Sequence, residues 1–257
     1  MRHTPDALRL LVEERLERLE LWPQLHGQEE SVRYALLAGG KRVRPVICLA
    51  TAEAAGAEPE AALPAACALE LVHTFSLVHD DLPALDDDEE RRGQPSTWKR
   101  YGEAVGILAG DALVTEAFRL ATSYDTTTIA RELAEAALGM IGGQYLDITG
   151  TAPDEATLHS LKTGCLFAAS VGLGLWAAGV AEAAQAPWRA FGNELGLLFQ
   201  IVDDILDGDG YVQTHGPAGA RRLADEAAER ARARLDNIRA DTGVLREIVD
   251  GLAVRTA

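Results

Sequence analysis

The sequence contains little positive charge and few lysines. Its 257 residues carry 24 basic and 40 acidic side chains, which gives a formal net charge of −16 at pH 7. Lysine occurs only at positions 41, 99 and 162, and arginine supplies nearly all of the other basic side chains. Because phosphate backbones attract basic faces, an acidic chain of this kind is not expected to bind nucleic acid.

Cysteine is also scarce. Cys48, Cys67 and Cys165 lie in separate apolar segments, without the spacing of a disulfide framework or of a metal site. They are predicted to be small buried residues in a reducing compartment. The expected localisation is therefore cytoplasmic.

Long uncharged runs are rare. Residues 1–21 have the pattern of a charged amphipathic helix and not of a signal peptide. Residues 164–181 carry no charged side chain, and this length reaches the lower limit for a membrane span. Many of these residues are alanine or glycine, which makes the run only weakly hydrophobic. We interpret it as a core helix and expect no transmembrane segment.

The hydrophobic pattern is helical. Apolar residues recur at spacings of three and four along nearly the whole chain, and no run alternates with the period of a half-buried strand. The sequence therefore predicts an all-α protein of about ten helices. No linker or fixed-period repeat divides the chain, so residues 1–257 are expected to form a single domain. The predicted helices cover about residues 5–21, 28–38, 44–55, 60–82, 103–122, 127–148, 154–181, 188–208, 219–239 and 242–254.

The most informative stretch is residues 77–93, where several aspartates between Asp80 and Asp88 follow a long apolar run. Charged groups that enter a core must be paired or must bind a metal. Crowded carboxylates suit a hard divalent cation, and Mg²⁺ commonly shares its coordination with substrate phosphates. Arg91 and Arg92 follow, with planar donors that match phosphate oxygens. The stretch therefore predicts metal-dependent phosphate chemistry.

Pro83 interrupts this stretch. Proline lacks a backbone donor and disfavours helix at the residue before it, here Leu82. The helix that carries Asp80 should therefore end nearby, so that Asp86 can turn back toward the same cation.

A second acidic cluster lies far downstream, in residues 200–207. Asp203, Asp204 and Asp207 have spacings that place them on one side of an apolar helix. One acidic helix end can be a solvated terminus, but two in a single bundle suggest a metal cage between facing helices.

A basic loop completes the pattern. Lys41, Arg42 and Arg44 follow two glycines and precede Pro45, where a new helix would present N-terminal amides that favour anions. Such a loop alone is more often an exposed basic turn, whereas beside two acidic clusters it predicts an anion site. His73 lies two helical turns before Asp80 and should face the same cavity.

Together these stretches resemble the trans-isoprenyl diphosphate synthase (polyprenyl synthetase) family, and within it the bacterial farnesyl diphosphate synthase type. The resemblance covers about residues 38–207 and rests on six motifs in one order. They are Gly39-Gly-Lys-Arg-Val-Arg-Pro45, His73 with Asp80-Asp-x-x-x-x-Asp86, Arg91-Arg92-Gly, Gly142-Gly-Gln-x-x-Asp147, Lys162-Thr163-Gly and Phe199-Gln-x-x-Asp-Asp-x-x-Asp207. It implies a helical bundle around a central cavity, assembled as a homodimer.

The resemblance implies a Mg²⁺-dependent condensation of isopentenyl diphosphate with dimethylallyl or geranyl diphosphate. Three Mg²⁺ ions would be bound by Asp80, Asp86 and Asp203, while the other aspartates act through water or orient these ligands. Those other aspartates are Asp81, Asp204 and Asp207. The allylic C–O bond would break first, and the released pyrophosphate would take the final proton, so that no side chain need act as the base.

The same resemblance implies two substrate sites. Isopentenyl diphosphate would be bound by Lys41, Arg44, His73 and Arg92. The allylic diphosphate would be bound by Arg91, Lys162, Thr163 and Gln200. Gln144 and Asp147 either face this cavity or form a buried hydrogen bond between helices. The implied catalytic residues are Lys162 and Thr163 with Asp80, Asp81, Asp86 and Asp203.

Product length is predicted from position. The growing chain should extend beside the helix that precedes Asp80, and a residue one turn back, about 5.4 Å away, would lie beneath the metal site. That residue is Phe75, with Ser76 beside it. The family's C15 synthases carry an aromatic residue there, so farnesyl diphosphate is the expected product. The alternative is geranylgeranyl diphosphate, C20.

The sequence departs from the family after Asp207. Members usually continue with a lysine-containing loop, whereas residues 208–220 are short and contain no lysine. Arg221 or Arg222 could substitute for the missing lysine. The departure casts doubt on closure of the site and leaves a non-catalytic partner subunit open, although such a subunit would have little reason to keep all six motifs.

Two other classes of protein fit the sequence less well. A class I terpene cyclase would need neither the basic loop nor a second complete aspartate motif. A ferritin-like di-iron protein would use paired Glu-x-x-His motifs, and only one, Glu70 to His73, is present.

Overall fold

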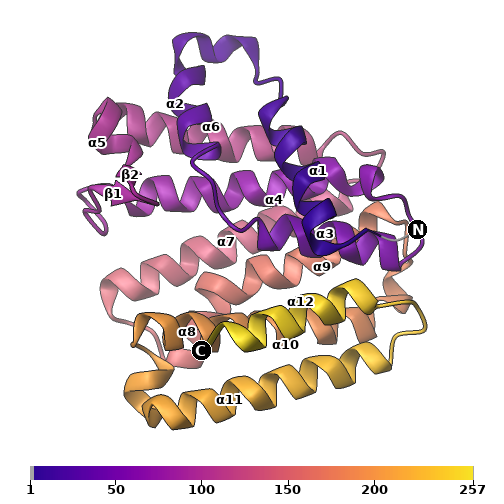
Figure 1. Ribbon diagram of the computed structural model, residues 1–257. Coiled ribbons are helices and arrows are strands. Elements are labelled where there is room, and N and C mark those ends of the chain that lie inside the picture. Colours follow the sequence, from indigo (N-terminus) through magenta and orange to yellow (C-terminus); the bar gives the residue numbers. More distant parts are fainter. Residues whose placement is uncertain (1–2, 257) are drawn as a thin grey trace.

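The structure, a computed structural model, describes residues 3–256 and is a bundle of α-helices, as predicted (Figure 1). The helices of the first half are α1 (Pro5–Glu17), α2 (Glu29–Leu36), α3 (Val43–Ala54), α4 (Pro59–Asp80), α5 (Thr97–Tyr101) and α6 (Glu103–Ala121). Those of the second half are α7 (Thr128–Thr149), α8 (Glu155–His159), α9 (Cys165–Ala177), α10 (Ala186–Asp207), α11 (Tyr211–Asp236) and α12 (Gly243–Ala253). In Figure 1, α11 and α12 lie on the side of the bundle opposite α2 and α6.

Helix α4 lies at the centre of the bundle. Pro59 begins it, where a missing N–H costs nothing. Nearly all faces of α4 are apolar because α1, α3, α6 and α9 pack around it. Burial of this kind, and not intrinsic propensity, provides most of a helix's stability. The helix is therefore a rigid support for the aspartates at its C-terminal end.

Helices α8 and α9 are joined by a π-helical turn, Ser160–Gly164. The sequence predicted one helix over 154–181, and the structure keeps the chain helical from Glu155 to Ala177. The turn widens the helix locally, a feature common at functional sites. It carries Lys162 and Thr163.

Two helices are long and apolar enough to cross a membrane, Pro59–Asp80 and Ala156–Ala177. In the first, 67% of the apolar window is buried inside the bundle, and in the second 50%. The buried side chains of α9 include Leu166, Phe167 and Leu173, so this helix contributes to the core as expected.

The prediction failed in three places. Helix α11 begins at Tyr211, not near residue 219, and passes a kink at Gly216, whose φ of 71° is left-handed. The glycines and proline of this segment had suggested a loop. The short helix α5 was missed, as was a small antiparallel ladder between β1 (Glu90–Arg91) and β2 (Gln94–Pro95).

The remaining short elements are brief helical segments, and the first contains a kink at His26. They are the 3₁₀ segments Pro23–Gln28, Glu182–Ala184 and Val254–Thr256. The last of these returns the end of the chain toward α10.

Candidate active site

A cavity of about 950 Å³ lies between the C-terminal part of α4, helices α6 and α7, the π turn and α10. The predicted site residues that line it are Arg44, His73, Phe75, Ser76, Asp80, Arg91, Arg92, Gln144, Lys162, Thr163 and Asp203. The predicted residues outside its lining are Lys41, Asp81, Asp86, Asp147, Gln200, Asp204 and Asp207. The fold thus brings segments that are more than a hundred residues apart to one cavity.

Asp80 is the last residue of α4 and faces the cavity. The chain then folds back, and the backbone N–H of Asp86 donates to the carbonyl oxygen of Asp80 at 2.8 Å. This confirms the bend predicted at Pro83. Burial, with the nearby charges of Asp86 and Asp81, raises the pKa of Asp80 to about 6, although Lys162 opposes the shift.

Asp81 points away from the cavity. Its side chain is 3% exposed and accepts hydrogen bonds from Arg91, whose Nε lies 2.9 Å from Oδ1. Arg91 also donates to Asp88 at 2.9 Å. Arg91 thus lines the cavity while fastening the acidic turn to the end of α4.

Asp203, on the last turn of α10, lies across the cavity from α4. Desolvation and the charge of Asp207 raise its pKa to about 6, and Arg44 opposes the shift. Among the described residues, neither the side-chain carboxylate of Asp80 nor that of Asp203 has a hydrogen bond or an ion pair. Both carboxylates therefore face the cavity without a protein cation directly on them.

Asp204 is turned into the protein. It is 3% exposed, accepts from the Gln200 side-chain amide at 2.6 Å and accepts from the Tyr211 N–H at 2.9 Å. A Cβ at Gly210 would lie 2.2 Å from its Oδ2, so glycine is required there. Asp204 thus fixes the start of α11 at Tyr211, inside the segment 208–220 that departs from the family.

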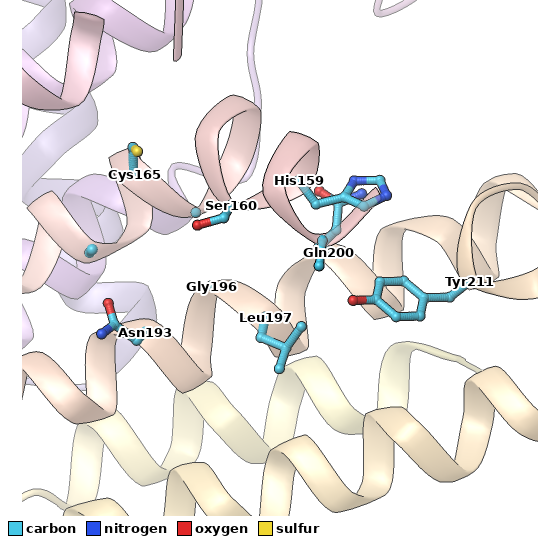
Figure 2. Close-up of a pocket in the computed structure, with 11 residues that line it drawn as sticks. His159, Ser160, Cys165, Asn193, Gly196, Leu197, Gln200 and Tyr211 are labelled. Carbon is cyan, nitrogen blue, oxygen red and sulfur yellow. The ribbon is translucent and has the colours of Figure 1, made fainter. Parts of the chain in front are cut away.

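The prediction that Gln200 contacts substrate is not supported by its position. Gln200 lies on another face of α10 from Asp203 and lines a side pocket of about 420 Å³ with His159 and Tyr211 (Figure 2). Its amide is bound to Asp204. Residues four apart share a helical face, so Gln200 lies with Asp204, and Asp204 is turned about 100° from its neighbour Asp203.

The carboxylates that face the cavity could bind Mg²⁺ only if a substrate diphosphate supplied further oxygen ligands. Within residues 3–256, no three Asp, Glu, His or Cys side chains lie close enough to bind a metal ion by themselves. Mg²⁺ is usually bound by one or two carboxylates, with water and substrate phosphate completing an octahedron. Asp80 and Asp203, ionised and facing one cavity, match that donor set.

A cationic pocket of about 380 Å³ adjoins the cavity and is lined by Lys41, Arg44, His73 and Arg92. The guanidinium of Arg92 lies against Gly40, where a Cβ would be 2.8 Å from it, and donates to the Gly39 carbonyl. This close approach explains Gly40, whereas Gly39 has a left-handed φ of 88° that favours glycine. Burial and the neighbouring arginines lower the pKa of His73 well below its usual value, so its ring is neutral.

Arg44 lies between the two spaces. Its guanidinium lies over Phe167 at 4.5 Å from the ring centroid, and its Nε has no hydrogen-bond partner. Burial lowers its pKa to about 10, which leaves it charged at neutral pH. A buried cation with an unused donor is suited to an anionic ligand.

The sequence did not identify Arg255 as a member of this pocket. It lies in the final 3₁₀ turn and lines the pocket with Lys41 and Arg44. No spacing could have indicated this, because the residue lies far from every other group in the sequence.

Arg42 has a structural role. It is 5% exposed, adopts a left-handed φ of 50° and pairs with the buried Glu70 at 2.5 Å. Glu70 is therefore an ion-pair partner and not half of a di-iron motif, which removes that alternative.

The opposite wall of the cavity carries Lys162, which pairs with Asp147 at 2.5 Å. Gln144 lines the cavity, and neither its amide nitrogen nor its oxygen has a partner. Buried amides are normally hydrogen-bonded. Of the two interpretations left open for this motif, Asp147 thus forms a contact between helices and Gln144 faces the cavity.

Comparisons with known proteins agree with this arrangement. The sequence model of the polyprenyl synthetase family matches residues 27–220. A farnesyl diphosphate synthase of Geobacillus stearothermophilus is 41% identical over 228 residues, 82% of this chain and 76% of that protein. A geranylgeranyl diphosphate synthase of Cyanophora paradoxa is 44% identical over 193 residues, 69% of this chain and 64% of that protein.

The chain spans about half to two thirds of the length of several geranylgeranyl diphosphate synthases that it matches. The crystal structure of a geranyltranstransferase from Thermotoga maritima superimposes with a TM-score of 0.86 at 30% identity, covering 99% of both chains. With two aspartate-bearing helix ends and a cationic loop around one cavity, the chain belongs to the polyprenyl synthetase family of isoprenoid synthases.

Proposed function

We propose that this protein joins isopentenyl diphosphate to an allylic diphosphate, dimethylallyl or geranyl diphosphate. The observation that carries the proposal is the shared wall between the acidic cavity and the cationic pocket. Arg44, His73, Arg92, Phe199 and Asp203 line both spaces. A metal-bound allylic diphosphate and a second diphosphate would therefore lie side by side.

The chain's own residues position the two substrates. Lys41, Arg44 and Arg92 supply positive charge to the isopentenyl diphosphate, and the neutral His73 supplies one N–H donor. Lys162 and Thr163 lie at the allylic side, where Lys162 would exchange Asp147 for a phosphate oxygen. Holding two reactants in contact removes much of the entropic barrier to their reaction.

Asp80 and Asp203, assisted by Asp86, would hold Mg²⁺ with the allylic diphosphate, while Asp81, Asp204 and Asp207 act indirectly. Mg²⁺, when bound, stabilises the negative charge that develops on the leaving diphosphate. The apolar part of the cavity lining, which includes Val114, Met140 and Ile141, would surround the prenyl chain. The pyrophosphate that leaves is the nearest base, so the acidic residues need not accept the proton.

We further propose a C15 product. Phe75 and Ser76 line the cavity on α4, and Phe75 is 8% exposed. A ring there would stop an elongating chain. Several relatives are named geranylgeranyl diphosphate synthases, so a C20 product is the second candidate. A terpene cyclase would have no evident use for the cationic pocket. A non-catalytic subunit would have no need of a cavity that both Asp80 and Asp203 face.

We also propose that residues 1–257 form one domain that acts in the cytoplasm as a homodimer. The thiols of Cys48, Cys67 and Cys165 are free, as a reducing compartment requires. Exposed apolar side chains along α6 and α7 support a partner copy. They are Ile107, Leu108 and Leu138, which lie outside the lining of the cavity. Leu138→Glu should give a monomer in light scattering, whereas a dimer unaffected by this change would place the interface elsewhere.

Product analysis tests the activity. Pure protein is incubated with isopentenyl diphosphate, Mg²⁺ and either primer, and products are identified by mass spectrometry beside those of Phe75→Ala. We expect C15 from the wild type and longer chains from the variant. Absence of elongation with both primers would rule out the synthase, and a C20 product from the wild type would rule out the role of Phe75.

A further inference from the structure

His79, a residue with no role so far, lies on the wall of the product cavity. It is one helical turn after Phe75 on α4, and helical side chains lean back toward the preceding turn. The rings of Phe75 and His79 meet edge to face, with centroids 4.9 Å apart and an interplanar angle of 74°. Both rings line the cavity.

A hydrogen bond anchors the His79 ring. Its Nε2 lies 3.0 Å from the carbonyl oxygen of Ile107 on α6. A carbonyl can only accept, so Nε2 carries the proton. The ring is therefore tied to a neighbouring helix and cannot turn with Phe75.

A glycine provides the space for this ring. A Cβ built at Gly110 on α6 would lie 2.1 Å from Nε2 of His79 and 2.2 Å from its Cδ2. The imidazole thus rests on the bare backbone of α6. Any side chain at position 110 would displace it.

We propose that His79 is a positioning residue for chain length, which sets the orientation of Phe75 by filling the space between α4 and α6. The proposal rests on the proposed elongation activity and extends it. If the His79 ring is removed or displaced, Phe75 can rotate toward Gly110 and Val114. The cavity then deepens along α6, and a longer prenyl chain fits.

The test measures the ratio of C20 to C15 product in His79→Ala and Gly110→Ala, each beside wild type. We expect this ratio to rise about tenfold in His79→Ala, the effect that loss of an aromatic contact and a hydrogen bond has on a rate ratio. Gly110→Ala should change the ratio by less, because its Cβ displaces the ring but fills part of the space that Phe75 would enter. Gly251→Ala is the matched control, because it is a helical glycine with open space around its Cβ. The control should leave the ratio unchanged.

A double variant separates positioning from general damage. If His79 acts through Phe75, His79→Ala should change the ratio little when Phe75 is already alanine. A lower kcat at an unchanged product ratio in the single variant would show a merely structural role and overturn the proposal. The proposal would also be overturned if His79→Ala changed the product ratio equally in the wild type and in the Phe75→Ala background.

A second measurement does not depend on activity. The chain has five phenylalanines, so protein labelled with fluorophenylalanine gives a simple ¹⁹F spectrum in which Phe75→Leu identifies the signal of Phe75. That signal should shift and narrow in His79→Ala and not in Gly251→Ala. An unchanged signal contradicts the contact, whatever the product. If the signal changes but wild type makes no prenyl chain, the proposed function fails while the contact stands.

Discussion

The ends of α4 and α10 each carry an Asp-Asp pair, and the two pairs are used in the same way. The first aspartate of each pair, Asp80 or Asp203, faces the cavity and has a pKa near 6. The second, Asp81 or Asp204, is buried and fastens the chain that follows. Adjacent residues on a helix point in directions about 100° apart, so one pair can serve a ligand and the fold at once.

The two pairs differ in what fastens them. Asp81 is paired with the guanidinium of Arg91, which reaches back from the ladder β1–β2. Asp204 accepts from a side-chain amide and a backbone N–H, which secure the start of α11, and Nε2 of His159 lies 3.9 Å from its Oδ2. The first connection is an ion pair with a permanently charged guanidinium, and the second consists mainly of hydrogen bonds within a tight turn. Loss of the Asp81 side chain should therefore destabilise the acidic turn after α4 more than loss of the Asp204 side chain destabilises the start of α11.

The largest predicted effect concerns the two residues that face the cavity. Asp80→Ala and Asp203→Ala should each lower kcat by about a thousandfold or more, because stabilisation of the leaving diphosphate is lost. Steady-state kinetics with saturating Mg²⁺ measure this. Asp87→Asn is the control, since Asp87 has a left-handed φ of 54° that asparagine tolerates. A tenfold or smaller loss in both cavity variants would contradict the roles of Asp80 and Asp203.

The buried residues should affect stability instead. Asp81→Ala should lower the free energy of unfolding by about 2 kcal/mol, less than for a wholly buried pair because the Arg91 side chain is 35% exposed. Asp204→Ala should cost about 1 kcal/mol, the loss of two hydrogen bonds with some relaxation. Urea unfolding measures both. A larger loss of stability in Asp204→Ala than in Asp81→Ala would show that the ion pair is not the stronger of the two connections.

The pKa values predict a pH-dependent effect of Mg²⁺. Asp80 and Asp203 have folded pKa values of about 6 against an ordinary 3.8, so the folded state binds more protons between about pH 4 and 6. Their contribution to stability therefore falls as pH rises through that window. Mg²⁺ with pyrophosphate binds the ionised forms, so it should raise Tm more at pH 7.5 than at pH 5.

The control for this prediction is the double variant Asp80→Asn, Asp203→Asn. It should lose both the pH effect and the Mg²⁺ effect, and without metal it should be more stable than wild type at pH 7.5. If Mg²⁺ with pyrophosphate raised Tm equally in the variant and the wild type, the cation would not be bound by Asp80 and Asp203.

The smallest predicted effect concerns Arg255. Arg255→Ala should raise KM for isopentenyl diphosphate about fivefold with little change in KM for the allylic primer, because Arg255 lines only the cationic pocket. Arg246→Ala, on α12 and outside both spaces, is the control. A change confined to KM for the allylic primer would show that the two substrates occupy the opposite spaces from those proposed here.

Much of this site was predictable from sequence because its chemistry is local. The helical period gave the all-α fold, and Pro83 indicated the bend that returns Asp86 to Asp80. The basic loop carried Lys41 and Arg44, and the structure places them in one pocket. Charge and spacing alone were enough for these residues.

The rest depended on tertiary contacts. The orientation of α4 and α10 about their own axes decides which aspartate of each pair faces the cavity. That orientation is set by the packing of the apolar faces of the two helices. Gln200 was misplaced for that reason. Residues 208–220 carried loop signals, but Asp204 accepts the Tyr211 N–H and starts α11 early. Arg255 and Gly110 matter only because the fold brings distant segments against His73 and His79.

The central claim is that two diphosphates react in one cavity. Pyrophosphate release from geranyl diphosphate should be followed with Mg²⁺ present, with and without isopentenyl diphosphate. The account predicts rapid release only when isopentenyl diphosphate is added, with one new C15 diphosphate formed per pyrophosphate. Equal release without isopentenyl diphosphate, accompanied by a hydrocarbon or alcohol product, would contradict it and indicate a cyclase.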